Sequence, residues 1–410
     1  MKPKYHPSDA PSRGFEKALP SRSAGGLGGA SALLGNTHQI TRPPPPDKTA
    51  QLRRLERFEL HSFVQKILAE MSVKDRKGTM QSRKVTKCLH VPRAKFVEVW
   101  KSAKNDLHYF GGLVICGDVW SCPLCAAKIS EHRGDEIKRA VESWEAQGGS
   151  VAMLTQTFPH YENQKCKPLL DKFAKARILM KKRPSYQTLM RQIGLAGNIN
   201  RTEVTYGANG WHIHCHTLLF LKGNVRLTSG ALLPLWASAC EAVGLPSPSR
   251  AHGVKISTPK EVAEYIAKQG KETSNWTIEK EMTKGHIKRG GMEGMTPFDL
   301  LRAYRDTKEE RYANLFREYS KAFRGKRQLV WSRGLRDMLA LAPEISDEEA
   351  ATSTDELDEL LTMIPLKVWN YIRKCNLRGQ LLELANQGKE KFTAGLDYFQ
   401  TLAGYTDSPF

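Results

Sequence analysis

The strand pattern of this chain is clearest in the run Trp211-His212-Ile213-His214-Cys215-His216-Thr217-Leu218-Leu219-Phe220. Its three histidines occupy alternate positions. Because side chains along a β-strand point to opposite faces with a period of two, the three imidazoles share one face. Leu218 and Phe220 continue that face as apolar residues, where charged imidazoles would repel one another unless something binds them. This strand therefore offers a row of candidate ligands.

A second strand precedes the histidine strand and supplies an acidic partner. Residues 201–206 alternate as a strand should, and residues 207–210, Gly-Ala-Asn-Gly, are typical of a turn. If the residues that flank this four-residue loop pair with each other, antiparallel pairing places Glu203 opposite His214. Directly opposed residues project to the same face with Cβ atoms roughly 5 Å apart, and a diagonal neighbour such as His216 stays within reach.

Glu203, His214 and His216 are thus predicted to form a group of two imidazoles and one carboxylate. Such a group with open positions suits a divalent metal that must also hold substrate oxygens, and His212 is a further candidate ligand. A pairing register shifted by one residue would turn Glu203 to the other face. The prediction therefore depends on the register.

The same histidines allow a second interpretation. The stretch His-Ile-His-Cys-His-Thr-Leu fits the pattern of histidine-triad nucleotide hydrolases, in which the central histidine is itself the nucleophile. A solvated strand face without a ligand is the third reading. The pattern alone does not separate these chemistries.

The composition favours a polyanionic partner. With 40% apolar and 26% charged residues, the 410-residue chain is typical of globular protein, but its net charge is +20. The last seventy residues carry 12 acidic and 6 basic side chains, so the body before them carries the entire positive excess. A basic body of this kind favours nucleic acid as the partner.

Three of the eight cysteines indicate a candidate zinc site. Cys122 and Cys125 have the spacing of a zinc knuckle, and Cys116 lies six positions upstream. The fourth ligand is open among Cys88, His90 and His132, and we favour Cys88. The expected role is structural, fixing a loop-rich region against the sheet. A redox Cys-x-x-Cys motif is the alternative.

The chain divides into five predicted segments. Residues 1–46 are rich in Pro, Ser and Gly and predict a disordered basic arm, and residues 47–84 predict a helix followed by a basic linker. Residues 85–135 hold the cysteines, 136–335 the histidine strand, and 336–410 an acidic tail. In the tail, the capping-box match at residues 353–356 predicts an apolar-periodic helix after it.

Strands and helices interleave over residues 151–270, and the predicted hairpin is antiparallel. We therefore expect an α+β fold with a central antiparallel sheet flanked by helices, a small zinc-binding module and a helical C-terminal extension. A single helix is expected from Thr296 to about Phe323.

A helix that opens at Thr258 carries a candidate nucleophile. Thr as the cap, Pro259 at the first helical position and Glu261 at the third are strong start signals. Residues three and four apart share a helix face, so Glu261, Tyr265 and Lys268 lie on one side. A phenol of pKa about 10 is a weak nucleophile unaided and needs a nearby cation for phosphoryl transfer. Tyr265 as a packing residue and Glu261 as a mere capping partner are the structural alternatives.

Three motifs in this order resemble those of the HUH endonucleases, in particular plasmid rolling-circle replication initiators with a single catalytic tyrosine. They are Leu154-Thr155-Gln156-Thr157, then His214-Cys215-His216, then Tyr265-Ile266-Ala267-Lys268. The similarity covers roughly residues 85–335. The chain has Ile213 where relatives often have Pro, which puts the role of His212 in doubt.

The resemblance implies an HUH nuclease-like fold and a bacterial, plasmid-encoded, cytoplasmic protein. It implies that Tyr265 nicks one strand of plasmid origin DNA, remains joined to the 5′-phosphate and leaves a 3′-hydroxyl primer. It also implies Mg²⁺ or Mn²⁺ at the histidine pair, a water-activating role for Glu261, and a host helicase and DNA polymerase as partners.

Two rival functions stay open. One is the histidine-triad nucleotide hydrolase, which needs neither metal nor tyrosine, and the other is a zinc-containing DNA-binding protein without catalysis. The absence of an apolar run of about 18 residues predicts a chain that does not span a membrane. The oligomeric state does not follow from the sequence.

Overall fold

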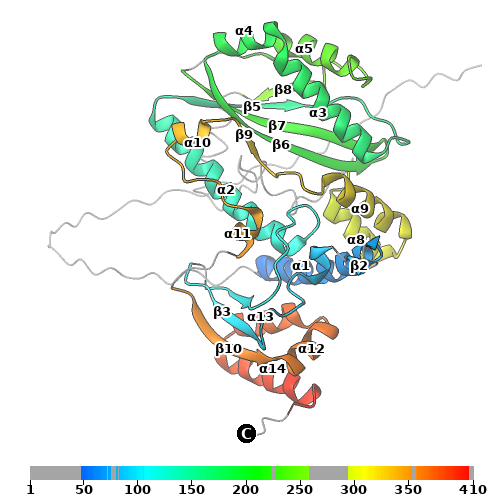
Figure 1. The fold of residues 1–410 in the computed structure, drawn as a ribbon, viewed down its shortest axis with the longest axis vertical. Coiled ribbons are helices and arrows are strands. Elements are labelled where there is room, and N and C mark those ends of the chain that lie inside the picture. Colours follow the sequence, from blue (N-terminus) through cyan, green and yellow to red (C-terminus); the bar gives the residue numbers. More distant parts are fainter. Residues whose placement is uncertain are drawn as a thin grey trace, which may run out of the picture. The chain divides into compact units, whose positions relative to one another are not determined.

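The computed structural model describes residues 48–71, 73–74, 80–81, 83–104, 106–223, 227–257, 294–352 and 357–405. These residues belong to one compact unit, residues 45–410. The fold is α+β, with antiparallel sheets flanked by helices (Figure 1). The predicted arm, residues 1–46, lies outside the described residues.

A five-stranded sheet with the order β8-β5-β7-β6-β9 forms the centre of the fold, and every pair in it is antiparallel. Its two long strands form the predicted hairpin. The pairing runs on to Gly207 and Gly210, so the turn has two residues instead of the expected four. Gly210 has φ +82°, a conformation that glycine adopts without strain. The strands of this sheet are β5 (Ser150–Gln156), β6 (Leu195–Gly207), β7 (Gly210–Leu221), β8 (Val254–Ser257) and β9 (Val330–Trp331).

Helices cover both faces of this sheet. On one face lie α3 (Cys166–Lys182), α4 (Pro184–Gln192) and α5 (Ser229–Glu241), packed on the side that carries Ile213 and Cys215. On the other face lies α2 (Pro123–Ala146), whose apolar side packs against Leu218 and Phe220 (Figure 1). The histidine face of β7 is therefore the α2 face, and its apolar end is anchored in that core.

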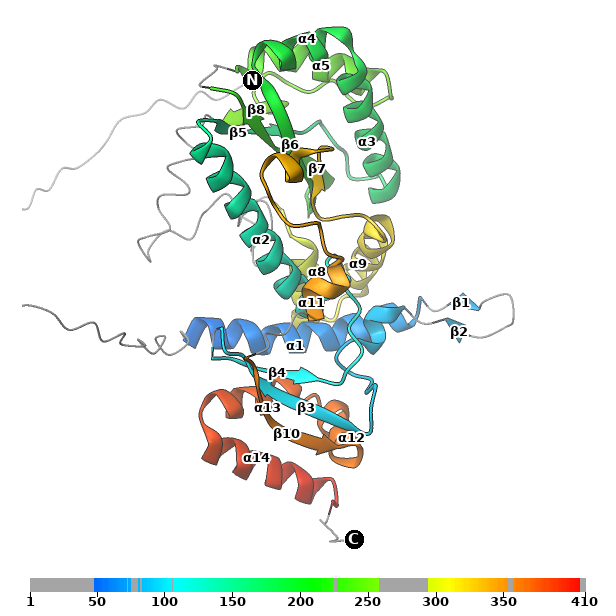
Figure 2. The same ribbon diagram turned by 60° about the vertical axis from the view of Figure 1, so that its left-hand side comes forward.

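A second sheet joins two segments that are far apart in the chain. Its order is β10-β3-β4, formed by β3 (Phe96–Lys101), β4 (His108–Gly111) and β10 (Glu359–Pro365). The helices α12 (Leu366–Lys374), α13 (Arg378–Asn386) and α14 (Lys389–Leu402) follow β10 and pack beside this sheet (Figure 2). The predicted cysteine segment and the predicted tail thus share one sheet.

The prediction of a wholly helical tail is wrong over residues 359–365. Val97 and Val99 of β3 need an apolar partner strand, and Ile364 pairs with Val97 and is fully buried on that face. This tertiary pairing overrides the helical period of the segment. The capping-box residues 353–356 lie outside the described residues.

The predicted helix from Thr296 to Phe323 consists of two helices. Thr296 and Asp299 form a reciprocal capping box at the start of α8 (Pro297–Thr307). Lys308 then adopts φ +60°, which ends the helix, and α9 (Glu310–Phe323) begins after it.

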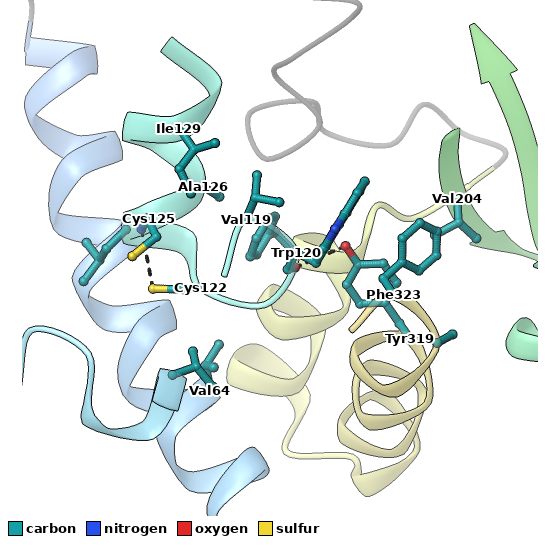
Figure 3. Packing of buried hydrophobic residues seen from close by; sticks show 14 of the residues in the cluster. Val64, Val119, Trp120, Cys122, Cys125, Ala126, Ile129, Val204, Tyr319 and Phe323 are labelled. Atoms are coloured by element: carbon teal, nitrogen blue, oxygen red, sulfur yellow. Dashed lines mark hydrogen bonds between the residues drawn. The ribbon is translucent and has the colours of Figure 1, made fainter. Parts of the chain in front are cut away.

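One continuous core connects the cysteine region to the central sheet. Trp120 packs on Phe323 with ring centroids 4.7 Å apart, and Tyr319 packs on Phe323 at 5.0 Å (Figure 3). The indole of Trp120 donates to the Lys326 carbonyl at 2.7 Å. Val204 of β6 belongs to the same cluster, so this core extends to the strand that carries Glu203.

The described residues also form six further elements. None of the helices in the described ranges is both long and apolar enough to cross a membrane. These elements are α1 (Lys48–Ala69), β1 (Val73–Lys74), β2 (Met80–Gln81), the 3-10 helix η1 (Lys84–Lys87), α10 (Leu335–Met338) and α11 (Asp347–Thr352).

Candidate metal centre and its surroundings

The β6–β7 hairpin places Glu203 directly opposite His214, and this confirms the predicted register. Oε2 of Glu203 lies 3.2 Å from Nε2 of His214 and 3.7 Å from Nε2 of His216. One ligand atom from each of the three residues lies within 4.8 Å of the others. The hairpin therefore brings together the predicted two-imidazole, one-carboxylate group.

These separations fit a shared ion. Two ligand atoms that each lie about 2.1 Å from one cation are separated by about 3 to 3.5 Å at the angles of octahedral or tetrahedral geometry. The observed 3.2 and 3.7 Å are close to this range. Glu203, His214 and His216 can therefore hold a divalent cation with little movement.

Two neighbours orient the group. Oγ1 of Thr155, on β5, lies 3.0 Å from Nδ1 of His216, so this hydroxyl contacts the ring nitrogen that faces away from Glu203. Nη2 of Arg201 lies 3.0 Å from Oε1 of Glu203, and the Arg201 side chain is buried. A contact of this kind holds the second oxygen of the carboxylate and keeps Oε2 toward the imidazoles.

His212 does not join the group. Its Nε2 lies 2.8 Å from Oγ1 of Thr157, and its ring stacks on His160 with centroids 4.8 Å apart and planes 8° from parallel. Burial, together with the charges of His214 and His160, lowers the pKa of His212 to about 4, so the ring is neutral near pH 7. His212, whose role the sequence left in doubt, therefore lies beside the group of Glu203, His214 and His216, which we call the metal group, and is not part of it.

His212 and His160 line a cleft of about 1660 Å³. The cleft is open to solvent and runs past the β6–β7 turn to the start of α9. Its lining mixes aromatic rings with charges of both signs, namely Phe158, Tyr206, Tyr312, Lys165, Arg311, His252, Glu162 and Glu318. The metal group therefore adjoins a cavity large enough for an extended ligand.

The predicted nucleophile and its neighbours, Tyr265, Glu261 and Lys268, lie outside the described residues. β8 ends at Ser257, just before them, and pairs with β5 beside the strand of His216.

The four cysteines Cys88, Cys116, Cys122 and Cys125 converge at one point, with all sulfur atoms within 4.8 Å of one another. Sγ of Cys125 lies 3.4 Å from that of Cys88 and 3.5 Å from that of Cys116. Four sulfurs about 2.3 Å from one zinc ion in tetrahedral geometry are separated by about 3.8 Å. The cluster therefore fits a tetrahedral thiolate site after a small expansion.

The other two candidates for the fourth ligand lie elsewhere. Nε2 of His132 lies 3.6 Å from Glu136, and His90 is not part of the group. Cys122 caps α2 and Cys125 lies in its first turn, the helix-opening context of a redox motif. The approach of Cys88 and Cys116 favours a metal site instead.

A buried arginine from the tail lies beside the cysteines. Arg378 is 1% exposed and donates to the Leu89 carbonyl at 2.8 Å, and its Nη1 lies 3.4 Å from Nδ1 of His61. Burial lowers the pKa of Arg378 to about 10, while the charges of Cys88 and Cys122 act in the opposite direction. Arg378 is thus a buried cation close enough to the cysteine cluster to act on the charge of its thiolates when they hold a metal.

The sequence analysis included Thr155 in a motif without giving it a role, and it did not identify His160 or Arg378. The alternation of residues 154–158 carried a signal, because it places Thr155 and Thr157 on the same side of the backbone where β5 ends. His160 follows the strand-ending Pro159, and Arg378 belongs to a different segment, so neither residue had a local signal.

Comparison with known proteins identifies two relatives. The chain is 30% identical over 319 residues to a protein named Rep from Streptomyces lividans. The aligned region covers 61% of this chain and 68% of that protein. The chain is also 33% identical over 140 residues to a neomycin resistance protein from Streptomyces cyanogenus. That aligned region covers 28% of this chain and 32% of that protein. No family model matches the chain, and no solved structure matches it.

Proposed function

Because the chain belongs to the family of the Streptomyces Rep protein, a plasmid replication protein, we propose that it initiates plasmid replication by cutting one strand of the origin DNA. The observation that carries this proposal is the convergence of Glu203, His214 and His216 beside the cleft. This arrangement supports an HUH-type endonuclease with a single catalytic tyrosine, Tyr265.

Glu203, His214 and His216 would hold Mg²⁺ or Mn²⁺. The bound cation would supply Lewis-acid neutralisation of the scissile phosphate. Arg201 and Thr155 keep the ligands in place, and His212 stays neutral beside them.

Tyr265 is the proposed nucleophile. Its phenol oxygen attacks the phosphorus and forms a phosphotyrosyl ester, while the bond from phosphorus to the 3′-oxygen breaks. The phenol loses its proton and the 3′-oxygen gains one, leaving a 3′-hydroxyl that can prime synthesis. Lys268 would favour the phenolate or hold a phosphate oxygen.

Glu261 is proposed for the terminating step. It would accept a proton from water or from a 3′-hydroxyl as that oxygen attacks the phosphotyrosyl phosphorus, and the bond to the Tyr265 oxygen would break. The phenol then regains its proton, and the enzyme is restored.

The cleft beside His212 is the proposed path of the DNA strand. Its aromatic rings, among them Phe158, Tyr206 and Tyr312, can stack unpaired bases, and Lys165 and Arg311 can contact phosphates. The Cys88, Cys116, Cys122 and Cys125 cluster is proposed to hold structural zinc. Origin DNA is therefore the proposed partner, with a host helicase and DNA polymerase acting on the primed strand.

One contact favours this function over a histidine-triad hydrolase. A nucleophilic imidazole needs an accessible ring nitrogen, and Nε2 of the central histidine, His214, is 3.2 Å from the Glu203 carboxylate. A carboxylate in this position favours a metal ligand.

Incubation of the protein with supercoiled plasmid that carries its cognate origin, in the presence of Mn²⁺, tests the proposal. We expect nicked circles with protease-resistant protein on the 5′ end. Tyr265→Phe should retain DNA binding and lose the covalent adduct, whereas Tyr398→Phe, at an exposed tyrosine, should behave as the native protein. Glu261→Ala should nick and fail to terminate.

Three results would contradict it. An adduct in the Tyr265→Phe variant would exclude Tyr265. Nucleotide hydrolysis that persists in a chelator, without nicking, would indicate the histidine-triad chemistry. A gel shift without any nicking would indicate a DNA-binding protein that lacks catalysis.

A further inference from the structure

A small pocket between α1 and α2 has a wall of positive charge. Its volume is about 120 Å³, and Arg54 and Arg57 of α1 and Lys128 of α2 line it. The other lining residues are mostly apolar, among them Phe58, Phe110, Leu124 and Leu382. The three cations therefore border a space with few polar groups to solvate them.

None of these cations forms an ion pair with a carboxylate in the described parts of the chain, and Nη1 of Arg54 is buried there without a hydrogen-bond partner. Burial, followed by the charge of Arg57, lowers the pKa of Arg54 to about 10. Burial also lowers the pKa of Arg57 and that of Lys128. The charges of four carboxylates oppose these shifts and do not cancel them: Glu383 acts on Arg54, Glu131 and Glu56 act on Arg57, and Asp358 and Glu131 act on Lys128.

The cysteine cluster can balance only part of the positive charge that lines this pocket. Cys125 lines the same pocket, and its thiolate acts on Lys128. The charges that act on Arg54 and Arg57 are those of neighbouring arginine and glutamate side chains. Buried cations are normally paired with an anion. Arg54 and Arg57, by contrast, lack such a counter-ion among the described residues.

Lys128 is held at the pocket by an aromatic ring. Its Nζ lies over the ring of Tyr109, 4.8 Å from the centroid. A cation over a ring face is attracted to it but keeps its full charge. The ammonium group therefore remains available to an anion beside Tyr109.

We propose that this pocket binds a phosphate group. Two guanidinium groups and an ammonium match the charge and the acceptor oxygens of phosphate. The volume holds several water molecules, which suffices for phosphate, and it is well below the roughly 300 Å³ at which pockets for drug-sized ligands begin. The ligand is therefore a free phosphate, a terminal phosphate or one phosphate of a DNA backbone, and not an enclosed nucleotide.

Thermal unfolding in sodium phosphate, against sodium chloride of equal ionic strength, tests the site, with isothermal titration calorimetry as the direct measurement. The native protein should show a saturable rise in Tm with phosphate. Arg57→Gln and Lys128→Gln should each lose most of that rise. Arg53→Gln removes an equal charge from an exposed position of the same helix and should keep it.

The phosphate-free Tm separates lost binding from lost folding. Removal of one of three mutually repelling cations should leave the Tm of Arg57→Gln equal to that of the native protein or higher. The proposal is overturned if the native protein shows no saturable response, or if Arg57→Gln and Arg53→Gln respond alike.

Competition identifies the source of the phosphate. An oligonucleotide without terminal phosphates that displaces inorganic phosphate would point to the DNA backbone, and displacement by a 5′-phosphorylated oligonucleotide alone would point to a monoester.

Asp355 and Glu356, outside the described residues, follow pocket-lining Ala351 in the chain. If phosphate binds only to an Asp355→Asn, Glu356→Gln variant, the chain supplies its own anion and the proposal fails.

Discussion

Oγ1 of Thr155 lies 3.0 Å from Nδ1 of His216, and this contact joins β5 to the candidate metal group, whose two histidines lie on the neighbouring strand β7. His216 has Nε2 toward Glu203 and Nδ1 toward the threonine. A histidine that ligates a metal is generally oriented by a partner at its other ring nitrogen. The Thr155–His216 contact is such a partner.

Thr155→Val should therefore weaken Mn²⁺ binding by about 10- to 100-fold, the usual effect of removing an outer partner of a metal ligand. Titration calorimetry with Mn²⁺ measures this directly. Thr157→Val is the matched control, because its hydroxyl contacts His212 and not a member of the group. Equal losses in the two variants would mean that the threonines act through general packing.

Cys88→Ser should remove the zinc ion that we propose for the cysteine cluster. A lost ligand should cost more than the roughly 10- to 100-fold in affinity that a lost outer partner costs. Zinc per chain, measured by mass spectrometry after gel filtration, should fall from one to near zero. Cys240→Ser, at a buried cysteine on α5, should retain one zinc per chain. Retention of zinc by Cys88→Ser would assign the fourth ligand elsewhere.

Arg378→Met should also weaken zinc retention, by about 10- to 100-fold, because the thiolates lose the buried cation that acts on them. Competition with a chromogenic chelator measures the affinity. Lys374→Met removes a positive charge from an exposed site in the same region and serves as the comparison. If the two variants release zinc equally, Arg378 serves packing alone.

His61 should make stability depend on pH. Burial, and then the charge of Arg378, lowers the pKa of His61 to about 3, so the folded state stays neutral where the unfolded chain, with a pKa of about 6.5, binds a proton. Stability contributed by neutral His61 is complete above pH 6.5 and is lost as pH falls toward 3.

Between pH 7 and pH 5 the native protein should lose about 2 kcal/mol more unfolding free energy than His61→Gln. Urea denaturation at the two pH values measures the difference. His132→Gln, at a more exposed histidine, should lose as much as the native protein. A native protein whose stability matches that of His61→Gln at both pH values would mean that His61 titrates normally.

The sequence predicted what short-range periodicity controls. Alternation and the turn after Tyr206 were enough to pair Glu203 with His214, since the register of a hairpin follows from its turn. The spacing of Cys116, Cys122 and Cys125 is also a short-range pattern, and it indicated a cluster. The pairing of β3 with β10 and the position of Arg378 beside the cysteines depend on contacts between distant segments, for which the sequence holds no local pattern.

Two misread elements show where local patterns fail. Residues 359–365 have spacing compatible with a helix, yet the apolar face of β3 selects a strand. The break between α8 and α9 at Lys308 is not marked in the sequence by a Gly or a Pro. In both cases the surrounding core decides the backbone conformation.

The pairing of β3 with β10 also governs the order in which the protein can mature during its synthesis. More than half of the chain separates Glu98 from its partner Met363, so the ribosome completes the hairpin of Glu203 and His214 long before the smaller sheet can close. A nascent or prematurely terminated chain would expose the open edge of β3 to other strands. The sheet beside the cysteine region can therefore close only after β10 has been translated, whereas the hairpin that carries Glu203, His214 and His216 forms early.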